Sequence, residues 1–244
     1  MKSNLQNFIL CIGIAIVGVS AFVPLAFSQQ PITANAGAAK AAEAKAKSDL
    51  ETDKKATEWV GSLQLGAAEK EGRLQKVIAT HLQTIRDWHN DHPYTNVPAG
   101  INPITGKPLS QLDRQMIADS AIAPTVHLDL MAGLRKDLTP EQVEVILDKY
   151  TIGKVAFTLN GYKSIVPDLT KEEEAKILEY LKQAREQAID YKNMRQISAI
   201  FEIYKTKCEQ YLNSNGRNWR QLFKAYVDKV KAQKEAEKQK EKSN

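Results

Sequence analysis

The chain has 244 residues, with 34 Lys and Arg against 29 Asp and Glu, a net charge of +5, and only two cysteines. Basic residues are interleaved with acidic ones and their surplus lies mainly in the C-terminal tail, so we exclude a nucleic-acid partner, which needs a continuous basic surface. Ala, Lys, Glu, Gln and Leu are plentiful whereas Gly and Pro are sparse, which favours a single helical domain with tails.

The N-terminus carries an export signal. An almost unbroken apolar run covers residues 8–27, and Ala26-Phe27-Ser28 has the small-x-small pattern that signal peptidase recognises. We therefore predict a signal peptide over residues 1–28, a new N-terminus at about Gln29, and a periplasmic or secreted protein. The alternative is an uncleaved anchor, because the run approaches the roughly 20 residues that span a bilayer. In that case the anchor would be the only membrane contact.

Residues 29–47 are rich in Ala and Lys and lack aromatic residues, so they cannot bury enough surface to offset their ordering entropy. We interpret them as a flexible tether. The helical domain then covers residues 48–230, and residues 231–244 form a charged tail. Once residues 1–28 are removed, Cys208 is the only cysteine, and its place on an apolar helical stripe predicts a buried thiol.

Apolar residues recur at three- and four-residue steps through the domain, which is the spacing that lines one helix face. This pattern predicts a short helix over residues 48–66 and a longer one over residues 67–89, which ends before Pro93. Ser110 begins the next helical segment, and Pro124 either kinks or breaks it.

Two capping boxes mark further helix starts. Thr139 is followed by Pro140 and by Gln142 at the third helical position, and Thr170 is followed by Glu173. In each box the hydroxyl and the later side chain can satisfy backbone N–H groups that have no partner within the helix. Both boxes therefore predict helices that begin at the next residue.

The remaining segments complete an all-α fold. Residues 151–158 are ambiguous because they combine branched residues with Gly153. A helix that closes at the turn 213–216 follows, and a last one opens at Trp219 and runs into the tail. Since no segment alternates strongly, we predict an irregular bundle of about six to seven helices with one long Pro-rich loop.

That loop covers residues 91–109 and contains four prolines. Long loops inside compact domains are uncommon and are often functional. Candidate ligand-binding side chains lie in it or just before it: Trp88, Tyr94, Asn96, Asn102 and Lys107. The alternative is an ordered strap that covers a helix end.

Three of the four histidines fall within twelve residues, just before the loop. His81, His89 and His92 are candidate metal ligands, and His89 shares a face with His92 if the helix persists through Asn90. The alternative is that these histidines are solvated or hydrogen-bond at the helix end. The spacing is not specific to a metal site, so we expect no cofactor.

The sequence contains no Gly-rich phosphate loop, nucleophile elbow or His-Glu-x-x-His helix. The candidate catalytic residues are His89, His92 and His127, of which His127 would act as a general base. Among the acids near the loop, Asp113, Asp119 and Asp129 are the candidates for a pair of catalytic carboxylates, although their separations cannot be read from the sequence.

Several segments resemble one family. They are residues 138–142, 150–153, 161–162, 165–170, 184–190 and 204–213, and together they resemble the exported bacterial domain DUF3826 of Bacteroidetes and related polymer-degrading bacteria. The order of Tyr150-Thr151-Ile152-Gly153 departs from the family's pattern. The resemblance implies an exported helical protein that is commonly encoded near polysaccharide-degradation genes, and it transfers no catalytic residue.

Three functions follow as hypotheses. The first is an exported, non-catalytic accessory protein, associated with polysaccharide utilisation, that binds a glycan or an envelope protein through the loop. The second is a polysaccharide-acting enzyme with a His-containing site. The third is a periplasmic chaperone, because residues 138–142 and 169–173 are similar to the paired Leu-Thr signatures of the Spy/CpxP chaperones.

Overall fold

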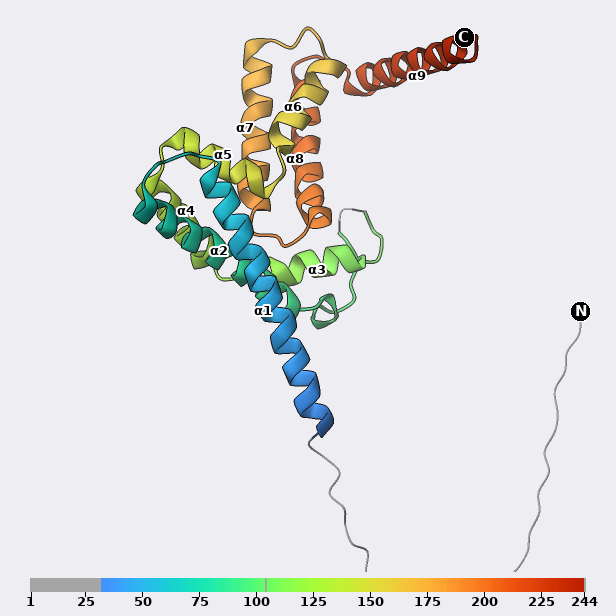
Figure 1. Cartoon of the computed structure of the whole chain (residues 1–244). Helices are drawn as coiled ribbons and strands as arrows, with labels where there is room; N and C mark the ends of the chain where they lie inside the picture. The colour runs from blue at the N-terminus through green and yellow to red at the C-terminus, as the bar shows by residue number, and fades with distance from the viewer. Residues whose placement is uncertain (1–31, 104, 244) are drawn as a thin grey trace, which may run out of the picture. The chain divides into compact units, whose positions relative to one another are not determined.

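A computed structural model of the chain describes residues 32–103 and 105–243, so the predicted signal peptide over residues 1–28 lies outside the described residues. The described part confirms the all-α prediction, since it contains nine α-helices, one short 3₁₀ turn and no strand (Figure 1). The expected number of about six to seven helices is therefore too low. The elements are α1 Ile32–Gly61, α2 Ala68–Asp91, η1 Tyr94–Asn96, α3 Gln111–Asp119, α4 Pro124–Asp137, α5 Pro140–Tyr150, α6 Lys154–Ile165, α7 Lys171–Ala188, α8 Met194–Ser214 and α9 Trp219–Ser243.

Two local features explain why the structure has more helices than the sequence predicts. The ambiguous segment 151–158 opens α6, whose branched Val155 and central Gly161 are poor helix formers. Burial of Val155 and Tyr162 against neighbouring helices overrides that weak propensity. Pro124 begins α4 at its first helical position, where the missing N–H removes no helical hydrogen bond.

The packing described below belongs to one compact unit that begins at Ala44. α1 begins at Ile32, so the described part of the expected tether 29–47 is helical. α9 likewise continues through residues 231–243 of the expected tail. Alanine, lysine, glutamate and glutamine dominate both segments, and these are strong helix formers. No helix among the described residues is long and apolar enough to cross a membrane.

The two predicted capping boxes are confirmed. The Thr139 hydroxyl accepts from the Gln142 N–H at 3.3 Å, and the Gln142 side chain accepts from the Thr139 N–H at 3.1 Å. Thr170 and Glu173 form the same pair at the start of α7. A third box begins α3, because Ser110 caps the helix and Asp113 returns the bond.

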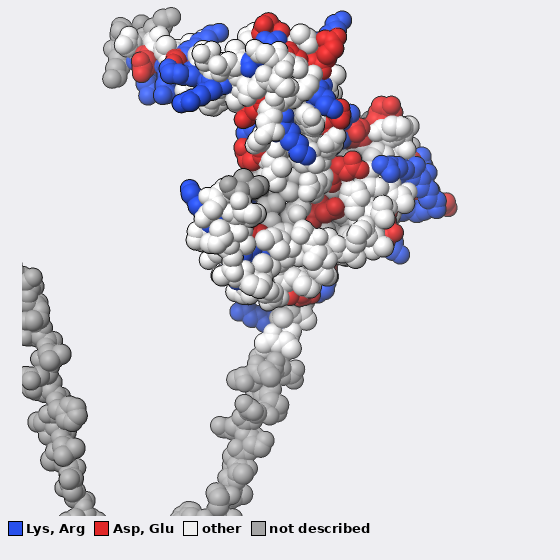
Figure 2. All heavy atoms as spheres, turned by 180° about the vertical axis from the view of Figure 1, so that it is seen from behind, with Lys and Arg blue, Asp and Glu red and all other residues white. Residues whose placement is uncertain are grey.

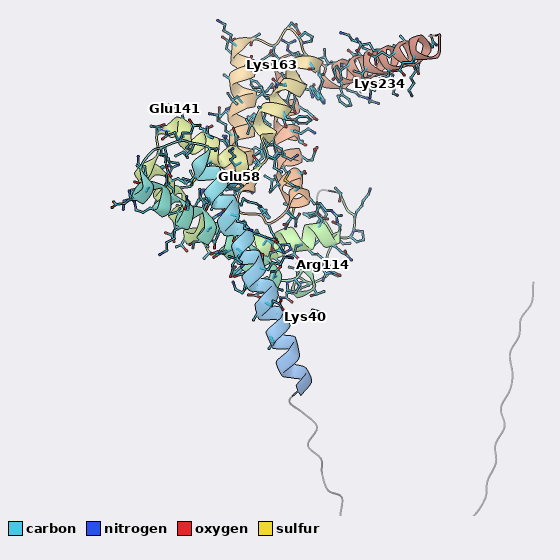
Figure 3. The ribbon with its side chains drawn as sticks, in the orientation of Figure 1. Lys40, Glu58, Arg114, Glu141, Lys163 and Lys234 are labelled. Carbon is cyan, nitrogen blue, oxygen red and sulfur yellow. The ribbon has the colours of Figure 1, made fainter. Side chains whose placement is uncertain are left out.

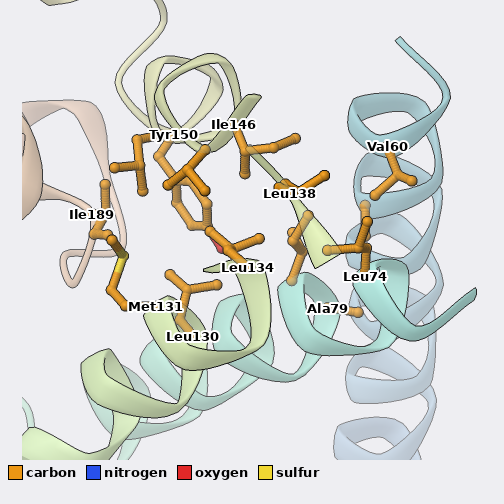
Figure 4. Close-up of a cluster of buried hydrophobic side chains, with 14 residues drawn as sticks. Val60, Leu74, Ala79, Leu130, Met131, Leu134, Leu138, Ile146, Tyr150 and Ile189 are labelled. Carbon is orange, nitrogen blue, oxygen red and sulfur yellow. The ribbon is translucent and has the colours of Figure 1, made fainter. Parts of the chain in front are cut away.

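The first hydrophobic cluster lies among α1, α2, α4 and α5 (Figure 4). Val60, Leu74, Leu134 and Ile146 are fully buried within it. Other members include Ala79, Leu130, Met131, Leu138, Tyr150 and Ile189. The presence of Ile189, which follows α7, shows that this cluster extends to the turn between α7 and α8.

The second hydrophobic cluster lies among α6, α7 and α8, with Trp219 of α9 against it. Leu181, Phe201 and Leu212 are among its buried side chains. Cys208 is completely buried there, which confirms the buried-thiol prediction, and burial raises the pKa of its thiol to about 12. Acidic and basic side chains are mixed on the surface around this end of the molecule (Figure 2).

α2 and α4 pack closely at Gly133. A Cβ atom at this position would lie 2.7 Å from both γ-carbons of Val77, which cannot rotate both methyls away because the side chain is branched at Cβ. We expect Gly133→Ala to lower the free energy of unfolding by about 1–3 kcal/mol through overpacking. Gly72→Ala is the matched control, since a Cβ there meets no atom within 4 Å, and it should stabilise α2 by about 0.5–1 kcal/mol. Urea denaturation of both variants measures the difference, and equal effects would contradict the close packing.

Candidate functional site

Asp190, in the turn between α7 and α8, accepts hydrogen bonds from two histidines. His81 Nε2 of α2 lies 3.0 Å from Asp190 Oδ1, and His127 Nδ1 of α4 lies 2.9 Å from Asp190 Oδ2. The His81 side chain is only 2% exposed. His81, a predicted metal-ligand candidate, is thus a buried contact that ties α2 to this turn.

The hydrogen bonds between Asp190 and its two histidines shift the pKa values of Asp190 and His127 in opposite directions. Burial opposes ionisation of Asp190, but hydrogen bonds from His127 and His81 outweigh it and hold the pKa of the carboxyl below its usual value. The hydrogen bond to Asp190 raises the pKa of His127 although burial opposes this, and Glu186 adds to it from 3.7 Å. His127 and Asp190 therefore form an ion pair at mildly acidic pH.

A second carboxylate collects three further contacts. Asp119 ends α3 and accepts from His89 Nδ1 at 2.7 Å, from Gln196 of α8 at 2.5 Å and from Gln115 at 2.8 Å. Its side chain is 4% exposed, so these contacts replace the hydrogen bonds to water that the carboxyl group loses on burial. We call His81, His89, Asp119, His127 and Asp190 the histidine–carboxylate seam.

The three candidate metal ligands do not converge. His81 faces Asp190 and His89 faces Asp119, whereas His92 Nδ1 donates to the Trp88 carbonyl at 2.8 Å. The His92 ring also stacks on the Trp88 indole, with 3.7 Å between centroids. Throughout the described residues, no group of three or more His, Cys, Asp or Glu is arranged to hold a metal ion.

The Pro-rich loop is fastened to α3 and covers the C-terminal end of α2. The Arg114 guanidinium (labelled in Figure 3) donates to the Val97 carbonyl at 2.8 Å and lies over the Tyr94 ring. Gln115 donates to the His92 carbonyl at 2.9 Å, and the Trp88 indole donates to Ala118 at 3.2 Å. These contacts have the form of the expected ordered strap.

The other predicted ligand-binding residues lie on the strap surface. Asn96 and Lys107 are exposed, whereas Asn102 is half-buried and accepts from the Thr105 N–H at 3.2 Å. The backbones of Asn102 and Lys107 are also joined by a hydrogen bond in the turn that follows. Ligand binding by this surface stays a prediction.

A cavity of about 370 Å³ adjoins the seam. Asp119, His127 and Asp190 line it, together with Leu128 and Tyr191. Of the carboxylates singled out from the sequence, only Asp119 lines this cavity. Asp113 belongs to the capping box of α3, and Asp129 faces a separate groove between α2 and α4. Sequence reasoning did not identify Asp190, because no local pattern connects it with the histidines.

A larger hollow of about 580 Å³ lies among α6, α8 and α9. Six aromatic side chains line it: Phe157, Tyr162, Phe201, Trp219, Phe223 and Tyr226. We call it the aromatic groove. Phe157 is 79% exposed and Phe223 is 47% exposed, and the Phe223 ring stacks on that of Trp219 with 5.9 Å between centroids.

This groove is not predicted by the sequence patterns described above, although the position of one aromatic residue, Phe157, indicates it. In α6, Val155, Leu159 and Tyr162 follow the helical repeat and face the second cluster. Phe157 falls between these positions and therefore points away from the cluster. An aromatic residue out of phase with the apolar stripe of its helix indicates a surface ring.

The His127–Asp190 pair gives a pH dependence. Because the pKa of His127 is raised, its stabilising contribution is full below about 6.5 and is lost as the pH rises through the folded-state pKa. Because the pKa of Asp190 is lowered, its contribution is full above about 3.8 and is lost as the pH falls through the folded-state value. The loss of unfolding free energy in His127→Gln should therefore be largest between about pH 4 and 6.5. Urea denaturation across pH 4–9 tests this.

NMR titration of the His127 ring distinguishes how much Asp190 and Glu186 each raise its pKa. Asp190→Asn should lower the pKa of His127, since it removes the carboxylate whose hydrogen bond raises that pKa most. Glu186→Gln should lower it less, because Glu186 is about half exposed and lies 3.7 Å away. A His127 pKa that does not respond to Asp190→Asn would show that the pair does not form.

Comparisons with known proteins agree with the family resemblance. No curated protein matches the chain. The family model described as "Protein of unknown function (DUF3826)" matches residues 50–232, a span that contains both hydrophobic clusters, the histidine–carboxylate seam and the aromatic groove. Because the match covers most of its length, the chain belongs to the DUF3826 family.

Proposed function

We propose that the protein is an exported accessory protein that binds a polysaccharide in the aromatic groove. The observation that carries the proposal is the exposure of Phe157 and Phe223 beside a hollow of ligand size. Large exposed apolar surfaces mark binding sites, because water covers them unfavourably. Sugar rings offer apolar C–H faces that pack against aromatic rings and hydroxyl groups that remain hydrogen-bonded at the rim.

Three of the six aromatic rings, those of Tyr162, Trp219 and Phe223, are held in place before a ligand arrives. Tyr162 is buried in the second cluster, and its hydroxyl donates to the Lys205 carbonyl of α8 at 3.1 Å. The Trp219 ring lies against Tyr162, with 5.1 Å between centroids, and Phe223 stacks on Trp219. A ligand would therefore meet rings whose side-chain entropy is already reduced, which favours affinity.

Export is supported by the apolar run over residues 8–27 and the Ala26-Phe27-Ser28 pattern. The polysaccharide context that the family resemblance implies points to the same class of ligand. A periplasmic or secreted place would bring the groove into contact with extracellular glycans.

Removal of the exposed rings tests the proposal. We expect Phe157→Ala and Phe223→Ala each to weaken polysaccharide binding on the order of tenfold, because each ring supplies stacking area. Affinity gel electrophoresis with soluble polysaccharides measures the effect. Leu50→Ala is the control, since Leu50 is 60% exposed but lies on α1, outside the groove. Retardation that both Phe variants retain would contradict the proposal.

A polysaccharide-acting enzyme is the second candidate, and one observation favours it. His127 lines the cavity beside the seam, and its Nδ1 donates to Asp190, so proton transfer would fall to Nε2, which lies 3.7 Å from Glu186 Oε1. If the wild type releases reducing ends from a polysaccharide, His127→Ala should lose about 10²–10⁴-fold of the rate. Leu128→Ala, which alters the same cavity without a titrating group, should keep most of it. Equal rates in the wild type and His127→Ala would exclude this role.

A further inference from the structure

We infer that the aromatic groove selects a neutral glycan and rejects uronate-rich, acidic polysaccharides. This inference rests on the proposed function, because it names the class of ligand at the same site. Four features of the groove carry it: the balance of its charges, an unpaired carboxylate, an unsubstituted stretch of helix backbone, and the near-absence of aliphatic side chains.

The charged side chains of the groove balance each other. Lys154 and Lys205 line it together with Glu202 and Glu209. Lys205 Nζ is bound to both carboxylate oxygens of Glu202, at 2.9 and 3.1 Å. Lys154 Nζ lies over the Phe201 ring, 5.6 Å from its centroid. Neither lysine is thus placed as a free cation for the carboxylate of a uronate.

Glu209 differs from the other three charged groups. Its side chain is half-buried, and its carboxylate makes no hydrogen bond or ion pair with another described residue. Burial raises the pKa of this carboxyl, Lys205 opposes the shift and Glu202 adds to it. A carboxylate accepts hydrogen bonds from sugar hydroxyls, and such charge-assisted bonds are about twice as strong as neutral ones. The same group repels an acidic ligand.

Gly161 leaves the floor of the groove open. It lies in the interior of α6, where glycine destabilises a helix by roughly 0.5–1 kcal/mol relative to alanine. Beyond its chain neighbours and the backbone of its own helix, no protein atom lies within 4 Å of the Cβ that another residue would place there. Packing therefore does not require glycine at this position, but its absent side chain lets a ligand approach the backbone.

The apolar lining distinguishes a sugar from a docked peptide helix. Six of the apolar side chains around the groove are aromatic, and Ile165 is the aliphatic one among its lining residues. Grooves that bind amphipathic helices offer a continuous hydrophobic surface to anchor side chains at helical spacing. Flat rings beside Asn160, Thr158 and Ser164 instead match the alternating apolar faces and hydroxyls of a pyranose chain.

The test compares neutral with acidic polymers on the full exported chain. Hydroxyethylcellulose and a galactomannan are the neutral probes, and polygalacturonate and alginate are the acidic ones. We expect affinity electrophoresis to show retardation by at least one neutral polymer and by neither acidic polymer. Gly161→Tyr should abolish it by filling the groove, whereas Gly161→Ala, which adds a single carbon against the ligand, should weaken it less than Gly161→Tyr does.

Glu209→Gln tests the charge itself. It keeps the size of the side chain but removes the charge-assisted bond, so neutral binding should fall about tenfold. Thermal unfolding checks that each variant is folded. Binding of an acidic polymer that Gly161→Tyr abolishes would overturn the neutral class but leave the proposed function intact. Failure of all four polymers to bind would overturn both. A dimer in sedimentation that Gly161→Tyr dissociates would also overturn the inference, because a second copy would then occupy the groove.

Discussion

The shared carboxylate of Asp190 joins the two halves of the helical domain. Its oxygens accept from His81 of α2 and His127 of α4, while the residues on either side enter different cores. Ile189 is buried in the first cluster and Tyr191 in the second. Removing one partner of a buried pair leaves an uncompensated charge, which is strongly destabilising. The position of the α7–α8 hairpin, and of every helix packed on it, therefore depends on this contact.

The aromatic groove is formed by helices that pack on the α7–α8 hairpin. α6 packs on α7 and α8 through Val155 and Tyr162, and the Tyr162 hydroxyl fixes the spacing between α6 and α8. α9 then begins with Trp219 against Tyr162, which sets the third wall. Phe157 is thus presented by α6, whose opposite face is buried, whereas Phe223 lies on α9, in which no described residue is fully buried. This arrangement suits binding, because rigid elements hold a site more accurately than loops do. The Pro-rich strap over residues 91–109, in contrast, is hydrogen-bonded by Arg114 and Gln115 of α3 and covers the end of α2.

Local chemistry was readable from the sequence, whereas long-range pairing was not. The boxes at Thr139 and Thr170 are complete within four residues, so their hydrogen bonds could be predicted and are present. α6 was missed because its stability comes from tertiary burial rather than from propensity. The partners of the histidines were missed for a similar reason, since 109 residues separate His81 from Asp190. Phe157 was visible only as a ring out of phase with its helix.

Glycan binding among α6, α8 and α9, as we propose, can be located directly because the three tryptophans lie on three separate surfaces. Trp219 lines the aromatic groove, Trp88 lies under the strap, and Trp59 packs on the first cluster. A titration of ¹⁵N-labelled protein with a neutral oligosaccharide, followed through the three indole N–H signals, distinguishes them in one experiment. We expect the indole N–H signal of Trp219 to shift and those of Trp88 and Trp59 to stay in place. A shift of the Trp88 signal with Trp219 unchanged would contradict this expectation and place the ligand at the strap.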